Sequence, residues 1–157
     1  MPVAAAASAL AVVTATRIAL WRGWRFGAEP LLWILHLSLA WIPVALLLLA
    51  LGQFGLLPAT AWLHAAGVGA MGGLILGVMS RVALGHTGRP LVLPAGIASA
   101  FVLIHVGAAL RVTAAASVGP WLPLIAVGTI CWVIAYGLFV LRYTPILLAP
   151  RVDGRPG

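Results

Sequence analysis

Long uninterrupted runs of apolar residues alternate with short polar segments along this chain. The segments between the runs, "RGWRFGAEP", "GQFGLLP", "GHTGRP" and "SVGP", are rich in the Gly and Pro residues that form turns. A helix crosses a bilayer with about 20 apolar residues, and five runs come close to or exceed that length. They cover residues 3–20, 30–51, 59–84, 91–112 and 120–141, so the pattern predicts five transmembrane helices.

The same runs indicate the fold class. Their residues are apolar on every side, whereas the strands of a transmembrane β-barrel alternate between apolar and polar residues. Hydrophobic residues make up 64% of the 157 residues and charged residues only 7%, which is too little polar material for the surface of a soluble domain. We therefore expect an all-α, polytopic transmembrane helix bundle that forms a single domain over residues 1–157, with a cytoplasmic tail over 142–157.

The distribution of Arg predicts how this bundle is oriented. All nine basic residues are Arg, and eight of them lie on one side of the predicted membrane. The positive-inside rule makes that side cytoplasmic, so we expect the N-terminus outside and the C-terminus inside. Because these Arg residues stand singly or in pairs at the ends of apolar runs, they predict topology and no binding of nucleic acid. Arg111 is the exception on the outer side, and we expect its guanidinium to snorkel to the outer interface.

Tryptophans gather near both predicted membrane surfaces. Trp21, Trp24 and Trp33 lie toward the inner face, and Trp62 and Trp121 lie toward the outer face. This distribution is typical of the aromatic belts that anchor helices at the two interfaces.

The third run carries a repeat of small residues. Gly69, Gly73 and Gly77 recur every four residues, which places them on one ridge of a helix. Without side chains on this ridge, a neighbouring helix can approach closely. We expect close helix packing here, and a bulky flat ligand would benefit from the same surface.

The four histidines are the candidate chemical groups, because the two acids, Glu29 and Asp153, both lie outside the apolar runs. From the rise of a helix, His64 and His105 are predicted to lie roughly 8 Å and roughly 10 Å below the outer surface. Since the third and fourth runs are antiparallel neighbours, we expect these two imidazoles to face each other at matched depth. His36 and His86 form a looser pair near the inner face.

Imidazoles on adjacent helices suit two kinds of cofactor. Two of them can ligate haem iron axially, or they can bind copper. Met71 follows His64 by two turns on the same face and would be a soft ligand for cuprous ion, although core packing is the favoured interpretation for a methionine. Each histidine can equally be a structural residue that hydrogen-bonds a neighbouring helix.

The stretch "MSRVALGHTGRPL" concentrates polar residues at the end of the third run. Gly85 is predicted to cap that helix, Arg89 to anchor it at the inner surface, and Pro90 to introduce the fourth helix. His86 and Thr87 are not explained by these roles, so His86 is kept as a site candidate.

These residues carry a resemblance to a known family. The segments "EPLLWILHLSLAW", "WLHAAGVGAMGGLILGVMSRVALGHTGRPL" and "RYTPILLAPRVDGRPG" are similar to the C-terminal part of the NnrS family, from residue 17 onward. The family consists of haem- and copper-containing membrane proteins linked to denitrification and to resistance against nitric oxide. The resemblance implies a multi-pass protein of the bacterial inner membrane that binds haem, with copper as a second metal. The histidines that match the family pattern, and that we expect to bind haem or metal, are His36, His64, His86 and His105.

The family's members usually have many more spans than the five predicted here. The chain is therefore expected to be a fragment, a truncated product, or a shortened member that needs a homo-oligomer or a missing N-terminal partner half. Its other expected partners are membrane lipid and nitric oxide or nitrosylated species.

Two classes of function follow from the sequence. The first is a haem protein of the nitrosative stress response, which we expect to bind its target without enzymatic turnover because no proton-delivery residues are evident. The alternative is a small permease or structural subunit without a cofactor, which the glycine ridge and the uniformly apolar runs also allow.

Overall fold

The computed structural model describes residues 1–154, and every regular element among them is helical. Five spans are long and apolar enough to cross a membrane, as the sequence predicts. A short 3₁₀ helix, η1 (Gly23–Phe26), follows the first span. The third span has three parts: α3 (Ala61–His64), the π-helical segment η2 (Ala65–Gly72) and α4 (Gly73–His86). The other four spans are α1 (Pro2–Leu20), α2 (Pro30–Gln53), α5 (Ile97–Ala115) and α6 (Trp121–Leu148).

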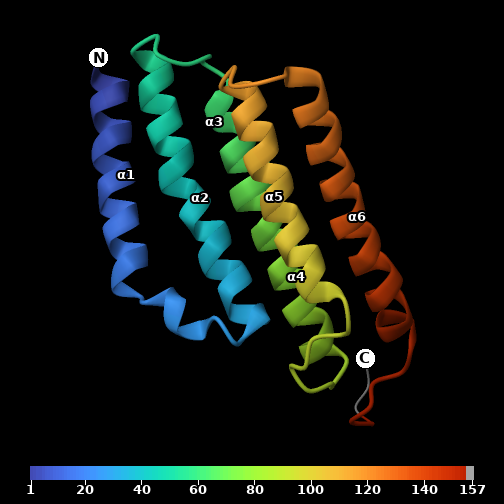
Figure 1. The fold of residues 1–157 in the computed structure, drawn as a ribbon. Coiled ribbons are helices and arrows are strands. Elements are labelled where there is room, and N and C mark those ends of the chain that lie inside the picture. The colour runs from blue at the N-terminus through green and yellow to red at the C-terminus, as the bar shows by residue number, and fades with distance from the viewer. Residues whose placement is uncertain (155–157) are drawn as a thin grey trace.

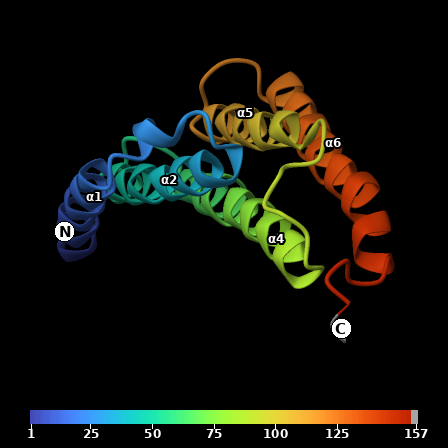
Figure 2. The same cartoon turned by 90° about the horizontal axis from the view of Figure 1, so that it is seen from below.

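Successive spans run in opposite directions, and the two ends of the chain lie at opposite ends of the bundle (Figure 1). We call the end that holds the α1–α2 and α4–α5 connections and the C-terminal segment the Arg-rich end. The other end, with the α2–α3 and α5–α6 connections, is the Arg-poor end. The helix α1 lies at one edge against α2, and α6 lies at the other edge against α5 (Figure 2). The helix α2 also contacts η2, α4 and α5, so it is the centre of the bundle.

Proline residues define several helix ends. Pro2 and Pro30 occupy the first turns of α1 and α2, where no backbone N–H is needed for an internal hydrogen bond. Pro43 and Pro145 lie inside α2 and α6. Membrane helices tolerate such residues because neighbouring helices and local adjustments satisfy the freed carbonyl groups.

Two predicted boundaries are wrong. The fourth helix begins at Ile97, because the segment before it contains Pro94 and turns at Gly96, whose φ of 85° suits glycine. The fifth helix continues to Leu148, beyond the predicted start of the tail at residue 142. Tyr143, assigned to the tail, is fully buried and stacks on Phe139 with ring centroids 4.6 Å apart.

The end of α4 also differs from the prediction. The residue with positive φ after this helix is Gly88, at 70°, while Gly85 lies within the helix. The hydroxyl of Thr87 donates hydrogen bonds to the carbonyls of Ala83 and Leu84, at 2.7 and 3.1 Å. Thr87 therefore satisfies carbonyl groups at the helix end, and Pro90 lies in the connection rather than at the start of α5.

A neighbouring helix packs closely on the glycine ridge, as predicted, and the structure shows that this helix is α2. A Cβ added at Gly69 would collide with the indole of Trp41, and one at Gly73 would collide with the hydroxyl of Ser38. A Cβ added at Gly77 would lie 3.0 Å from Cγ2 of Ile34. The flat group that lies on this ridge is thus a tryptophan of the chain itself.

Candidate functional site

His36 lies in α2 near the Arg-rich end and has a defined tautomer. Its Nδ1 atom is 3.0 Å from the carbonyl oxygen of Leu32, one turn earlier in the helix. A carbonyl oxygen can only accept a hydrogen bond, so Nδ1 carries the proton. In the neutral imidazole, Nε2 then holds a free lone pair. This is the arrangement in which a backbone carbonyl orients a metal-ligating histidine.

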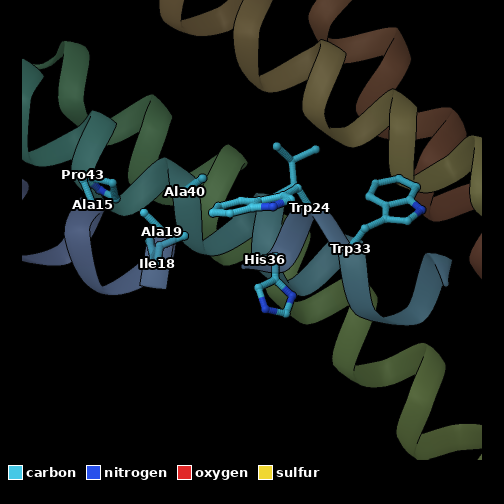
Figure 3. Close-up of a pocket in the computed structure, with 10 residues that line it drawn as sticks. Ala15, Ile18, Ala19, Trp24, Trp33, His36, Ala40 and Pro43 are labelled. Carbon is cyan, nitrogen blue, oxygen red and sulfur yellow. The ribbon is translucent and has the colours of Figure 1, made fainter. Parts of the chain in front are cut away.

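The imidazole of His36 borders an apolar groove of about 530 Å³ between α1 and α2. Figure 3 shows His36 and Trp24 at this groove, with Trp33 nearer the start of α2. Trp21 meets the His36 ring edge-on at 6.5 Å between centroids, and Phe26 lies 5.8 Å away. A groove of this size, apolar with few polar groups, is typical of a site for a small molecule or cofactor. The residues that line it are Ala15, Ile18, Ala19, Gly23, Trp24, Trp33, His36, Leu37, Ala40 and Pro43.

Gly23 lies directly against the His36 ring. A Cβ built on Gly23 would overlap the imidazole carbons Cγ and Cδ2. The glycine thus makes room for the ring, and η1 covers one of its faces. Two residues that the sequence analysis assigned only to an aromatic belt, Trp24 and Trp33, line the groove beside it.

His105 in α5 has the opposite tautomer. The indole Nε1 of Trp41 donates a hydrogen bond of 3.0 Å to its Nδ1 atom. Because an indole N–H can only donate, Nδ1 must hold the lone pair and Nε2 must carry the proton in the neutral ring. The residue is 8% exposed, and its Nε2 atom is buried with no hydrogen-bond partner among the described residues. In this arrangement His105 has no free lone pair for a metal.

The predicted matched depth of His64 and His105 is wrong. A Cβ on Gly73 would lie 3.0 Å from Cε1 of His105, so His105 is level with Gly73. Gly73 follows His64 along the same span by nine residues, which is on the order of 10 Å along the axis. The error came from the span boundaries, since α5 extends to Ala115 and places His105 deeper than the sequence indicates.

The remaining candidates all belong to the third span. His64, at the end of α3, is close enough to Arg111 for the guanidinium charge to act on it. His86 is exposed at the Arg-rich end, and its carbonyl oxygen accepts a hydrogen bond of 2.8 Å from Arg151. Met71 is 61% exposed in a groove beside α2, so its expected core packing is wrong.

No group of three or more His, Cys, Asp or Glu side chains able to hold a metal ion exists within residues 1–154. No three of the four histidines therefore meet at one metal site in this part of the chain. Their individual roles as cofactor or metal ligands stay predictions.

Sequence reasoning missed the partners that distinguish these histidines. Trp41 and Gly23 were not singled out, and the glycine ridge predicted only close packing of a neighbouring helix, with room that a bulky flat ligand could also use. The i−4 carbonyl of Leu32 is available to any histidine in a helix, so the sequence held no signal that His36 would use it.

Fold and site together define a polytopic α-helical membrane protein with an apolar groove that His36 helps to line. The chain belongs to the NnrS family: the family described as "NnrS protein" matches residues 1–151. It is thus a multi-pass membrane protein related to nitric oxide stress. The match includes α1, which the resemblance from residue 17 onward had left out. Comparisons with curated proteins and with solved structures gave no match.

Proposed function

We propose that this protein binds haem in the groove between α1 and α2, where Nε2 of His36 would ligate the iron, and that it acts in the bacterial inner membrane to protect the cell from nitric oxide. The observation that carries the proposal is the hydrogen bond from His36 Nδ1 to the Leu32 carbonyl. It leaves Nε2 with the lone pair that iron requires. His105, by contrast, uses its lone pair on Trp41.

The lining of the groove suits a flat amphipathic cofactor. Aromatic and aliphatic side chains form its walls, including Trp24 and Trp33. Arg22 precedes η1 and Arg25 lies within it, and the same 3₁₀ turn contributes Gly23 and Trp24 to the groove. The apolar macrocycle of haem would suit the walls of this groove. Its carboxylates would suit the cationic surface that these Arg residues form.

Each residue has a defined task toward the cofactor. His36 would hold the iron, the Leu32 carbonyl accepts the hydrogen bond from Nδ1 and orients the ring, and the tryptophans would exclude water from the bound group. Bound haem iron supplies a coordination position for nitric oxide. The described residues include no acid inside the spans to deliver protons, which favours binding or sequestration over turnover.

Copper does not fit the described residues as a centre built from three side chains. It stays a prediction of the family resemblance, and no step is derived through it.

The test is an absorption spectrum of the protein purified from haem-supplied cells. We expect a Soret band that shifts on reduction and on addition of nitric oxide, and we expect His36→Ala to lose it. His105→Ala and His86→Ala are the matched controls, because each removes one imidazole elsewhere and should keep the band. If His36→Ala retains the wild-type spectrum, the ligand is assigned incorrectly. A colourless wild-type protein that carries solute flux in proteoliposomes would instead support the cofactor-free permease.

A further inference from the structure

The guanidinium of Arg111 was predicted to snorkel to the outer interface, and this prediction is wrong. Arg111 lies in α5, four residues before the helix ends at Ala115. Its Nη1 atom donates a hydrogen bond of 2.8 Å to the hydroxyl of Thr129, which lies eight residues into α6. Both helices meet at the Arg-poor end (Figure 1), so the contact holds the guanidinium toward the middle of the bilayer, roughly 10 Å below the start of α6.

The surface of α6 is shaped to receive this side chain. A Cβ added at Gly128 would lie 3.0 Å from Cγ of Arg111, so the missing side chain lets the Arg111 stem lie along the helix. The guanidinium borders a pocket of about 320 Å³ formed by one residue of η2, one of α5 and two of α6. Its lining residues are Val68, Arg111, Thr129 and Trp132.

The charge of Arg111 has no acidic partner among residues 1–154. The two acids of the chain, Glu29 and Asp153, lie at the Arg-rich end, in the α1–α2 connection and in the C-terminal segment. The nearby ionisable group is His64, which is basic. The Nε atom of Arg111 is buried and has no acceptor among the described residues. An unpaired cation within a membrane span is costly, and such residues commonly mark sites for ligands or ions.

We propose that Arg111 and Thr129 form a binding site for an oxyanion at the Arg-poor end of the bundle. The chemistry that fits is a negatively charged oxygen pair, from a small inorganic oxyanion or from the phosphate of a lipid headgroup. A guanidinium offers a planar fork of N–H donors that matches such oxygens, and the Thr129 hydroxyl holds that fork in place. The site is distant from the His36 groove and independent of haem.

The first experiment measures thermal unfolding of the purified full chain in nitrite, nitrate or phosphate, against chloride at equal ionic strength. A ligand that binds the folded state raises the melting temperature by an amount that grows with the logarithm of its concentration relative to its Kd. We expect at least one oxyanion to stabilise the wild type, with about tenfold or greater loss of apparent affinity in Arg111→Gln. Arg142→Gln is the matched control, because it removes an exposed Arg near the other end of the bundle.

The second experiment separates a free oxyanion from a lipid phosphate. Native mass spectrometry of delipidated protein, titrated with phosphatidylglycerol or with diacylglycerol of the same chains, reports whether the phosphate group is required. We expect a lipid phosphate to bind the wild type and Arg142→Gln, and to bind Arg111→Gln about tenfold more weakly, if lipid is the source. If a free oxyanion stabilises the wild type and Arg111→Gln binds the lipid as well as the wild type does, the site belongs to a soluble oxyanion.

Thr129→Val keeps the charge and removes the hydroxyl that orients it, so this variant decides the matter if Arg111→Gln does not fold. It should weaken whichever anion binds the wild type. The proposal is overturned if wild type, Thr129→Val and Arg111→Gln respond alike in both experiments. The Soret spectrum should be unchanged in all three, so failure here is distinct from failure of the haem proposal.

Discussion

His36 and His105 carry the proton of their neutral imidazole on different ring nitrogens. Nδ1 of His36 donates a hydrogen bond to the Leu32 carbonyl, whereas Nδ1 of His105 accepts a hydrogen bond from the Trp41 indole N–H. When the partner of Nδ1 is a donor, the Nδ1 lone pair is used and Nε2 carries the proton. When the partner of Nδ1 is an acceptor, Nδ1 carries the proton and the Nε2 lone pair is free. The identity of the partner atom therefore decides which imidazole can bind a metal.

The Trp41–His105 hydrogen bond should be stabilising. Replacing Trp41 with Phe leaves Nδ1 of a buried histidine without a donor, which costs about 1–3 kcal/mol of unfolding free energy. Trp121→Phe is the control, because Trp121 is 60% exposed. Reversible unfolding in mixed micelles with increasing dodecyl sulfate measures both variants. Equal stability of the two would contradict the role assigned to this bond.

Gly23 should be needed for the position of the His36 ring. In Gly23→Val the new side chain occupies the space of the imidazole, so we expect the Soret band to shift or to be lost. Gly27→Val, in the same connection, is the comparison, because a Cβ there meets only a backbone oxygen at 3.8 Å. Similar spectra from both variants would count against the packing described for Gly23.

The third span shows how one element departs from the regular α-helical period. A π-helix bonds residue i to residue i+5, so η2 has wider turns than an α-helix and the seven-residue spacing of His64 and Met71 no longer puts them on one face. Met71 consequently lies in the groove beside α2, and His64 lies near Arg111 of α5. The carbonyl of Gly72, at the end of η2, accepts a hydrogen bond of 2.9 Å from the Tyr136 hydroxyl. A contact from α6 thus satisfies a backbone group at the point where the hydrogen-bond pattern changes.

The glycine ridge of this span should tolerate no added methyl group at Gly73. In Gly73→Ala the Cβ collides with Ser38 and presses on His105, for which we expect about 1–3 kcal/mol of destabilisation. Gly137→Ala, on a helix surface with no heavy atom within 4 Å, should be neutral or stabilising by about 0.5–1 kcal/mol. The same micelle unfolding assay compares the two variants. If Gly73→Ala unfolds with the same free energy as the wild type, α2 lies farther from the ridge than the structure places it.

At the scale of the whole molecule, the "GHTGRP" segment joins the last helix to the rest of the bundle. Arg151 donates to the His86 carbonyl and forms an ion pair with Asp153, and Val152 donates its N–H to the Thr87 carbonyl at 3.3 Å. The hydrogen bond with Asp153 also raises the pKa of Arg151 above its ordinary value. The C-terminal segment is thereby held against the end of α4 (Figure 1).

The orientation of the bundle is a prediction that concerns the whole molecule. The Arg-rich end should face the cytoplasm, because seven Arg of the described residues flank spans there and only Arg111 lies at the other end. Green fluorescent protein fused after the last residue should fluoresce, and alkaline phosphatase fused at the same point should be inactive. The opposite pair of results would reverse the orientation.

The sequence by itself determined the class of the molecule, its five spans and the close approach of a neighbour to the glycine ridge. These follow from hydropathy and from side-chain size, which act over consecutive residues or at a fixed helical spacing. Only the tertiary structure decided that α5 begins at Ile97, that Tyr143 is buried, and that His105 lies level with Gly73 rather than with His64. Each of these depends on contacts between residues far apart in the chain or on a local turn. The partner atom of an imidazole is a contact of this kind, so the choice between His36 and His105 as a ligand required the folded chain.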